Sequence, residues 1–109
     1  MTSQHRKHRG MATQRIAAAH LEPLFPHVTP RGAGERGTDL LHTPGWAFEV
    51  KATSRDPLLP ALRQADANAA YGEVPVVLWR PNGLGAERAG DWVAAMTFDT
   101  LTDVIRRLM

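Results

Sequence analysis

Hydrophobic residues along this chain recur with two different spacings, which predict helices and strands in alternation. From about Met11 to Glu22, apolar positions repeat every three or four residues, as on one face of an α-helix. The segments Leu40–His42 and Trp46–Lys51 are short and rich in residues that favour strands, and Thr43–Gly45 between them reads Thr-Pro-Gly, a strong turn sequence. This part of the chain therefore predicts a β-hairpin that follows an N-terminal helix.

The second half of the chain predicts a strand–helix–strand unit and a closing helix. A helix from Asp56, its cap, to about Ala70 precedes an apolar strand at Val74–Trp79. Because this helix connects the last strand of the hairpin to the apolar strand, the two strands are expected to be parallel neighbours. Trp92–Met96 predicts an added strand, and helical spacing from Phe98 to Leu108 predicts a final helix.

Composition places these elements in one α/β domain. The chain has 109 residues, of which 43% are hydrophobic and 22% are charged, as in ordinary globular proteins. We expect residues 1–9 to form a mobile basic arm and residues 10–109 to form a single domain. The sequence has no cysteine, no apolar stretch of about 18 residues and no apolar N-terminal core of a signal peptide. These features favour a cytoplasmic protein without disulfides, thiolate zinc sites or membrane contact.

Two acidic residues in the predicted hairpin, Asp39 and Glu49, are the strongest candidates for a functional site. If Thr43–Gly45 form the loop, Asp39 lies opposite Glu49, and directly opposed residues have Cβ atoms about 4.5–5.5 Å apart. Two carboxylates so close repel each other unless a cation lies between them, and Mg²⁺ prefers carboxylate oxygens. Lys51 lies on the same face two residues beyond Glu49, so a metal and an ammonium group would flank one spot.

Two alternatives to this arrangement stay open in the sequence. A two-residue Pro-Gly turn would place Asp39 opposite Val50 instead. The first register is preferred because it segregates the side chains, and a slip by one residue would move each of them to the other face. In that register the apolar residues of one face are Leu40, Trp46, Phe48 and Val50. The other alternative is a solvated strand face with alternating charges, since Asp followed by Glu-x-Lys is not a specific motif by itself.

Charge is distributed unevenly along the chain, although the formal net charge is only +2. Residues 1–38 contain six Arg or Lys and two acids, whereas residues 39–109 contain seven Arg or Lys and nine acids. The basic residues near the N-terminus are Arg6, Lys7, Arg9 and Arg15. A basic arm ahead of an acidic metal site suits a polyanion such as DNA. A solubilising disordered tail is the alternative.

The chain resembles the PD-(D/E)XK nuclease superfamily, and in particular its small archaeal and phage-type Holliday junction resolvase branch. The resemblance covers about residues 6–79, including the basic start of the first helix. Asp39, Glu49 and Lys51 match the catalytic motif of the family, although Thr38 stands where that motif usually has Pro. The resemblance implies a restriction-endonuclease-like αβββαβ core with a mixed central sheet, here followed by an added strand and a C-terminal helix.

The resemblance also implies a function, namely that of a Mg²⁺-dependent endonuclease that hydrolyses phosphodiester bonds in branched DNA. Within the family, the chain is most similar to the phage-type Holliday junction resolvases. Asp39 and Glu49 would hold Mg²⁺ or Mn²⁺ together with the Val50 carbonyl, and Lys51 would orient the attacking water. One site per chain cannot cut two strands of a symmetric four-way junction at once, so a homodimer is expected. A phage-encoded protein of this kind would act in the host cytoplasm.

Other residues receive roles from the same resemblance. Gln14 occupies the position of a family Glu that helps to hold metal, so it would be a neutral ligand, or alternatively a Gln at the edge of the core. Gln64 resembles a helix-borne catalytic Gln near the metal site. The residues expected to contact DNA are Arg6, Lys7, Arg9, Arg31, Arg36 and Arg63.

Two further functions stay open beside the junction resolvase. One is a nicking, flap or single-strand nuclease of the same fold, with the same residues but another substrate geometry. The other is a non-catalytic protein that binds DNA structures through an impaired site, because Gln14 brings no charge to a metal.

Other short patterns in the chain predict no further site. Gly32–Gly37 matches G-x-G-x-x-G, but an acidic residue and a strand follow it instead of a helix, so no nucleotide cofactor is expected. His5 and His8 have a metal-like spacing without further ligands. Trp79 and Trp92 are expected to pack in or around the core rather than to stack on bases.

Overall fold

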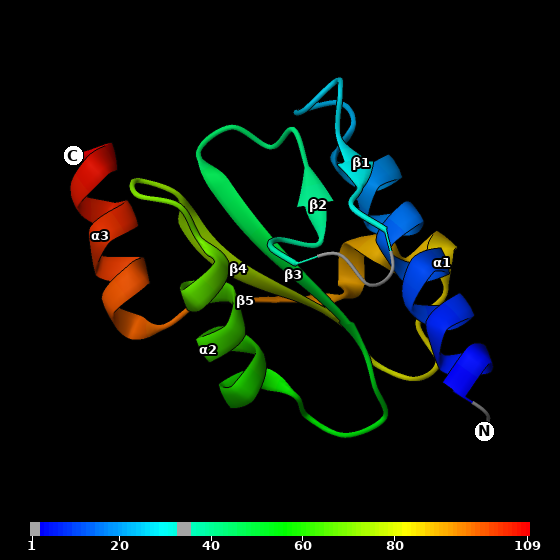
Figure 1. Cartoon of the computed structure of the whole chain (residues 1–109). Helices are drawn as coiled ribbons and strands as arrows, with labels where there is room; N and C mark the ends of the chain where they lie inside the picture. Colours follow the sequence, from blue (N-terminus) through cyan, green and yellow to red (C-terminus); the bar gives the residue numbers. More distant parts are fainter. Residues whose placement is uncertain (1–2, 33–35) are drawn as a thin grey trace.

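The computed structural model describes residues 3–32 and 36–109, and the side chains of residues 9–32 and 36–109. The chain forms a mixed α/β structure in which short strands lie between three helices (Figure 1). The helices are α1 (Ser3–Leu21), α2 (Leu58–Asn68), α3 (Phe98–Leu108) and the 3₁₀ segment η1 (Ala86–Asp91). The strands are β1 (Thr29–Pro30), β2 (Leu40–Leu41), β3 (Trp46–Ala52), β4 (Val74–Arg80) and β5 (Val93–Ala95).

The central sheet is mixed and has the strand order β3-β4-β5. β3 and β4 are parallel, with Glu49 beside Val77 and Lys51 beside Trp79, whereas β5 runs antiparallel to β4. The parallel pairing confirms the prediction made from the strand–helix–strand order, because α2 returns the chain along the sheet between the two strands. β3 is an edge strand of this sheet, so one row of its backbone groups faces away from β4.

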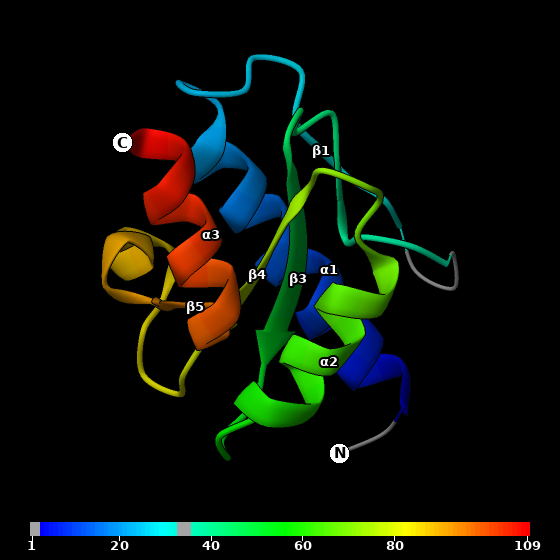
Figure 2. The ribbon, with the colours of Figure 1, turned by 90° about the vertical axis from the view of Figure 1, so that its left-hand side faces the viewer.

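Apolar side chains form one core on each face of the sheet. On one face, Ala17 and Ala18 of α1 pack with Phe48 and Val50, and Val104 of α3 packs against the same cluster. On the other face, α2 packs Ala61 and Ala65 against Val77. Figures 1 and 2 show the result, with α2 on the opposite side of β3 and β4 from α3. The predicted segregation is confirmed, because Leu40, Trp46, Phe48 and Val50 all belong to the first core.

The ends of the helices follow from local sequence. Pro57, and not the predicted Asp56, is the N-cap residue of α2, although the Leu58 N–H donates to Asp56 Oδ1 over 2.8 Å just before the helix. At the start of α3, Thr97 Oγ1 accepts from the Thr100 N–H over 3.1 Å. No helix within residues 3–32 and 36–109 is long and apolar enough to cross a membrane.

α1 begins earlier than the apolar spacing predicted. It starts at Ser3 instead of about Met11, so residues 3–9 of the expected mobile arm are helical. Gln, Arg and Lys have good helix propensities, and apolar periodicity does not detect a helical turn that carries no apolar stripe.

The predicted hairpin register is wrong. β2 pairs with β1, with Thr29 opposite Leu41 and Pro30 opposite Leu40, and it does not form a ladder with β3. The Asp39 N–H donates to the Phe48 carbonyl, so the backbone of Asp39 pairs with neither Glu49 nor Val50. The turn is irregular, because His42 adopts a positive φ of 63° and Gly45 a φ of 87°. A regular hairpin count cannot describe such a turn.

Candidate functional site

Asp39 connects the small β1-β2 sheet to the free edge of β3. Its N–H donates to the Phe48 carbonyl over 2.9 Å, and its own carbonyl accepts from the Arg31 N–H over 2.8 Å. Its side-chain Oδ2 accepts from the Val50 N–H over 2.7 Å. The Asp39 carboxylate therefore binds an edge amide of β3 and is fixed next to Glu49.

Glu49 lies in the middle of β3 and is almost completely buried, with 2% of its surface exposed. It alternates with Phe48 and Val50, so it points to the face that α2 covers. Its Oε2 is buried without a hydrogen-bond partner in the described part of the chain. A buried carboxylate oxygen without a partner is rare in folded proteins and calls for an explanation.

The Asp39 and Glu49 carboxyl groups interact directly. The pKa of Glu49 is raised from its ordinary 4.5 to about 7, first by burial and then by the charge of Asp39 and a side-chain hydrogen bond with Asp39. Lys51 acts in the opposite direction but does not outweigh these causes. Burial and a neighbouring carboxyl group therefore both disfavour the charged form of Glu49.

Lys51 extends the site toward α2. Its Nζ lies 3.5 Å from Glu49 Oε1 and donates a hydrogen bond to Gln64 Oε1 over 3.0 Å. Gln64 is exposed at the border of the buried stripe of α2, as the sequence suggested. The structure thus brings together four of the predicted site residues, which come from the segment before β2, from β3 and from α2: Asp39, Glu49, Lys51 and Gln64.

A cavity of about 500 Å³ lies between α1 and the end of β3. Lys51 and Val50 line one wall, and Arg9 lines another. The Arg9 Nη2 donates to Asn82 Oδ1 over 2.8 Å, which holds the guanidinium at the cavity. The remaining lining residues are Gly10, Ala52, Thr53, Ser54 and Asn82. The cavity therefore carries two basic side chains, Arg9 and Lys51, from elements far apart in the sequence.

Sequence reasoning missed Asn82, which is a candidate because of its place in the topology. It follows the end of β4, and Lys51 stands near the end of β3. The carboxyl ends of parallel strands meet at the same edge of a sheet, where ligands bind in open α/β sheets. This rule could have singled out the Pro-Asn-Gly turn after β4.

Gln14 makes no hydrogen bond to the acidic pair within the described residues. It is on the same helical face as Ala17 and Ala18, which pack on the face of β3 opposite to Glu49. Its Oε1 is buried and has no hydrogen-bond partner among the described residues. Its role as a metal ligand stays a prediction, and so does the role of the Val50 carbonyl.

The other predicted DNA contacts fall into three groups. Arg63 and Arg36 are exposed, on α2 and before β2 respectively. Arg31 is half-buried and donates to the Thr38 carbonyl, so it stabilises the segment before Asp39. Arg6 and Lys7 are in α1, but their side chains are outside the described part, as are residues 33–35 of the glycine-rich segment.

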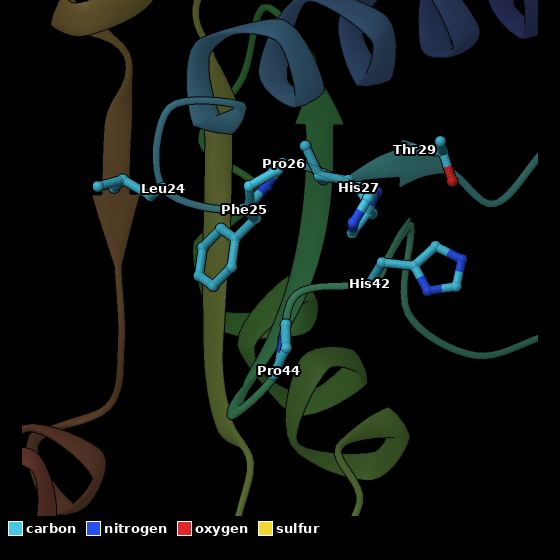
Figure 3. Close-up of a pocket in the computed structure, with 8 residues that line it drawn as sticks. Leu24, Phe25, Pro26, His27, Thr29, His42 and Pro44 are labelled. Carbon is cyan, nitrogen blue, oxygen red and sulfur yellow. The ribbon is translucent and has the colours of Figure 1, made fainter.

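A cavity of about 860 Å³ is separate from the acidic pair. It is formed by the turn after α1 and the turn after β2, as Figure 3 shows. Its lining is mainly apolar, with Leu24, Phe25 and Pro44 beside His27 and His42. Carboxylate oxygens are the preferred ligands of Mg²⁺ and this lining provides none, so we assign the metal chemistry to the acidic pair and not to this cavity.

A comparison of the chain with protein-family models, with curated proteins and with solved structures found no match. The chemistry of the site is therefore argued from its geometry. In the described ranges, 3–32 and 36–109, no group of three or more His, Cys, Asp or Glu residues could hold a metal. Asp39 and Glu49 would supply two ligands, and a hard cation at such a pair completes its shell with carbonyls, waters and substrate phosphate oxygens.

Proposed function

We propose that this protein is a metal-dependent DNA endonuclease that hydrolyses phosphodiester bonds in branched DNA, with a four-way junction as the preferred substrate. The observation that carries the proposal is the buried contact between Asp39 and Glu49 beside the ammonium group of Lys51. Burial of carboxylate charge is unfavourable, and a divalent cation at this pair would offset it more fully than Lys51 does alone. Lys51 stands near the carboxyl end of β3, the edge of a parallel sheet at which ligands bind.

The two carboxylates would hold Mg²⁺ or Mn²⁺, with the Val50 carbonyl as a further ligand. The donor set fits a hard divalent cation, because Glu49 Oε2 is buried and lacks a partner. When bound, such a cation lowers the pKa of a coordinated water and neutralises charge on the scissile phosphate. Asp39 is held for this role by the Val50 N–H, which fixes one carboxylate oxygen and orients the other.

Lys51 would act on the reacting phosphate. Its ammonium group has three donors, and Gln64 accepts one of them. The other donors can orient the attacking water and stabilise negative charge that develops on the phosphoryl oxygens. Gln64 is then a positioning residue, because it holds the ammonium group at the site from the side of α2.

DNA would approach along the basic side of the site. Arg9 and Lys51 line the same cavity, and basic groups at a cleft attract and orient a polyanion. The order of elements from α1 to β4 is αβββαβ, which supports a restriction-endonuclease-like core as part of the proposal. Two copies would place two sites on a symmetric junction.

Cleavage of a panel of labelled DNA substrates tests the proposal. The panel contains a four-way junction, a flap, a nicked duplex and a single strand, each incubated with Mg²⁺, Mn²⁺ or a chelator. We expect paired, symmetric cuts in the junction that need a divalent cation. Preferred cutting of the flap, nicked duplex or single strand would instead favour a related nuclease, and no cutting of any substrate with any metal would refute the enzyme.

Two variants connect any activity to the site. Glu49→Gln keeps the size of the side chain but removes its charge, and Lys51→Met removes the ammonium group. Both are expected to abolish cleavage, whereas Glu87→Gln, an exposed acid in η1, should cut like the wild type. Equal activity in Glu49→Gln and in the control would show that another protein in the preparation does the cutting.

A non-catalytic DNA-binding protein is the second candidate. It is favoured by one observation, since Gln14 brings an uncharged and unpartnered Oε1 where the resembling family has an acid. In this case junction binding would survive both chelation and Glu49→Gln, and no metal would support cleavage. Gln14→Glu would be the informative variant, because a restored acid would produce cutting only if the rest of the site is competent.

A further inference from the structure

α3 carries a stripe of apolar side chains that the rest of the described chain leaves exposed. Phe98 is 80% exposed and Leu108 is 82% exposed, while Leu101 and Ile105 are 43% and 47% exposed. Four of the eleven residues of α3 are large, apolar and exposed, so they form a stripe and are not isolated exposed positions. Contiguous exposed apolar surface of this kind marks a site of interaction.

The spacing of these residues is that of a helix-pairing seam. They follow each other at intervals of three, four and three residues: Phe98, Leu101, Ile105 and Leu108. This is the a/d pattern of a coiled coil, in which each apolar side chain packs into the surface of a facing helix. α3 thus has the pattern to pair with one other helix.

The helix is held to the sheet by a neighbouring face, so the seam is free to receive a partner. Val104 packs against the core, and Arg107 Nη1 donates to the Gly72 carbonyl over 3.1 Å. Figure 2 shows α3 at one side of the molecule, in front of β5.

Charge on α3 favours a second copy in the antiparallel orientation. Its first turn carries Asp99 and its last turn carries Arg106 and Arg107, while Asp103 in the middle pairs with both arginines of its own helix. Antiparallel pairing of two identical helices places Asp99 of each copy beside the basic end of the other. Parallel pairing would bring like charges and like helix dipoles together.

We propose that the α3 seam is the interface between two copies of this chain, related by a two-fold axis that crosses the middle of the helix. In this arrangement Leu101 packs against the partner's Ile105, and Phe98 against the partner's Leu108. An isologous contact of this kind closes after two copies. The pairing stands on the exposed seam alone, and only its use in cutting both strands of a junction rests on the proposed function.

Each helix contributes only eleven residues, so the interface is small. Small interfaces are typical of weak or transient association. The dimer should therefore dissociate on dilution, and its mass should depend on concentration. Analytical ultracentrifugation of the full chain over about 1 to 100 μM spans the range expected for a weak interface.

Leu101→Asp tests the seam by placing a charge at its centre. We expect dimerisation to weaken at least tenfold, with far-UV circular dichroism unchanged. Leu59→Asp is the matched control, because Leu59 is 71% exposed on α2 and far from the seam in sequence. It should dimerise like the wild type. Phe98→Asp, at a more exposed position, repeats the test if Leu101→Asp does not fold.

Cysteine cross-linking tests the orientation, because the chain has no cysteine of its own. Under mild oxidation a mixture of Leu101→Cys and Ile105→Cys should form a cross-linked heterodimer more readily than either variant forms a homodimer. Efficient cross-linking of each variant with itself, at the expense of the mixture, would show parallel pairing and overturn the arrangement.

A wild-type chain that is monomeric at every concentration overturns the interface, and so does a dimer that Leu101→Asp leaves intact. None of these measurements contains DNA or metal. Glu49→Gln should dimerise as the wild type does, so a failure of the nuclease proposal and a failure of the interface give different results.

Discussion

Two polar clusters lie at the ends of neighbouring strands, and they differ in how well their charges are partnered. At the end of β4, Arg80 donates to Thr13 Oγ1 over 3.2 Å and to the Leu84 carbonyl over 3.0 Å. Its guanidinium also lies 5.6 Å from the centre of the Trp92 ring. On β3, Glu49 has one buried oxygen without any hydrogen-bond partner in the described chain, and its nearest neighbours include a second carboxyl group.

The difference separates a structural cluster from a candidate site. Arg80 connects α1, the loop after β4 and the residue that precedes β5, so its bonds stabilise the fold in the absence of any ligand. Lys51 compensates one Glu49 oxygen from 3.5 Å, whereas the other Glu49 oxygen has no hydrogen-bond partner in the described chain and lies beside Asp39. Sites arranged for a ligand often reduce the stability of the free protein, whereas structural clusters do not.

The largest expected effect is on cleavage by Glu49→Gln. The amide keeps the volume of the side chain but supplies a weaker ligand to the cation, so junction cleavage should fall by about 10³-fold, which corresponds to about 4 kcal/mol of transition-state stabilisation. Single-turnover rates at saturating protein measure this loss without a contribution from binding. Asp39→Asn should lose activity similarly, because the amide keeps an oxygen that can accept from the Val50 N–H but removes the negative charge that would hold the cation.

The second effect is on the stability of the metal-free protein, which Glu49 is expected to lower at neutral pH although cleavage needs it. In the folded chain the pKa of Glu49 is raised from 4.5 to about 7, so between these pH values the folded state binds more protons than the unfolded state. The free energy of unfolding of the metal-free protein should therefore fall as pH rises through this window, by up to about 3 kcal/mol. Urea unfolding at a series of pH values measures it.

Glu49→Gln isolates this contribution, because the amide does not titrate. The variant should lack this fall and should be more stable than the wild type above pH 7. Excess Mg²⁺ should narrow the difference, since a ligand that binds only the folded state stabilises it. If the free energies of unfolding of the wild type and Glu49→Gln changed with pH in parallel, the unfavourable burial of the Glu49 charge would be contradicted, whatever the outcome of the cleavage assay.

The third effect tests the partnered cluster. Arg80→Met removes two hydrogen bonds from a charged group while it keeps much of the apolar stem, so the protein should lose about 2 kcal/mol of stability at every pH between 5 and 8. Urea unfolding measures the loss. Arg88→Met is the control, because Arg88 is exposed and its ion pair with Asp91 is on the surface. Such pairs contribute about 0–1 kcal/mol.

The sequence predicted the elements of this fold better than their connections. Apolar spacing identified the strands at Trp46–Lys51 and Val74–Trp79, because their apolar side chains pack in a core, and it identified the final helix, whose apolar stripe stays exposed. It missed the first turns of α1, where no apolar residue marks the inward face. It also assigned β2 to the wrong partner, since a two-residue strand carries too little pattern to specify its neighbour.

The acidic pair was predicted for a reason that was only partly correct. A regular hairpin was expected to place Asp39 opposite Glu49, but the backbone of Asp39 bonds to Phe48. The two carboxyl groups still interact, because the side chain of Asp39 reaches along the edge of β3 to the Val50 N–H. Asn82 could not be found from a motif, because its place beside Arg9 depends on how α1 packs against the end of the sheet.

The smallest expected effect is that of Gln64→Met, which sharpens the boundary of the candidate site. Gln64 touches the acidic pair only through Lys51, whose Nζ donates to its Oε1 over 3.0 Å. Loss of one hydrogen bond to a charged group should reduce cleavage about tenfold, through a lower kcat with little change in KM. Asp66→Asn, also exposed on α2, should change neither. If Gln64 serves folding alone, Gln64→Met should instead lower stability and leave kcat per folded molecule unchanged. Gln64→Glu, which keeps an acceptor for Lys51, would then show no gain in kcat over Gln64→Met.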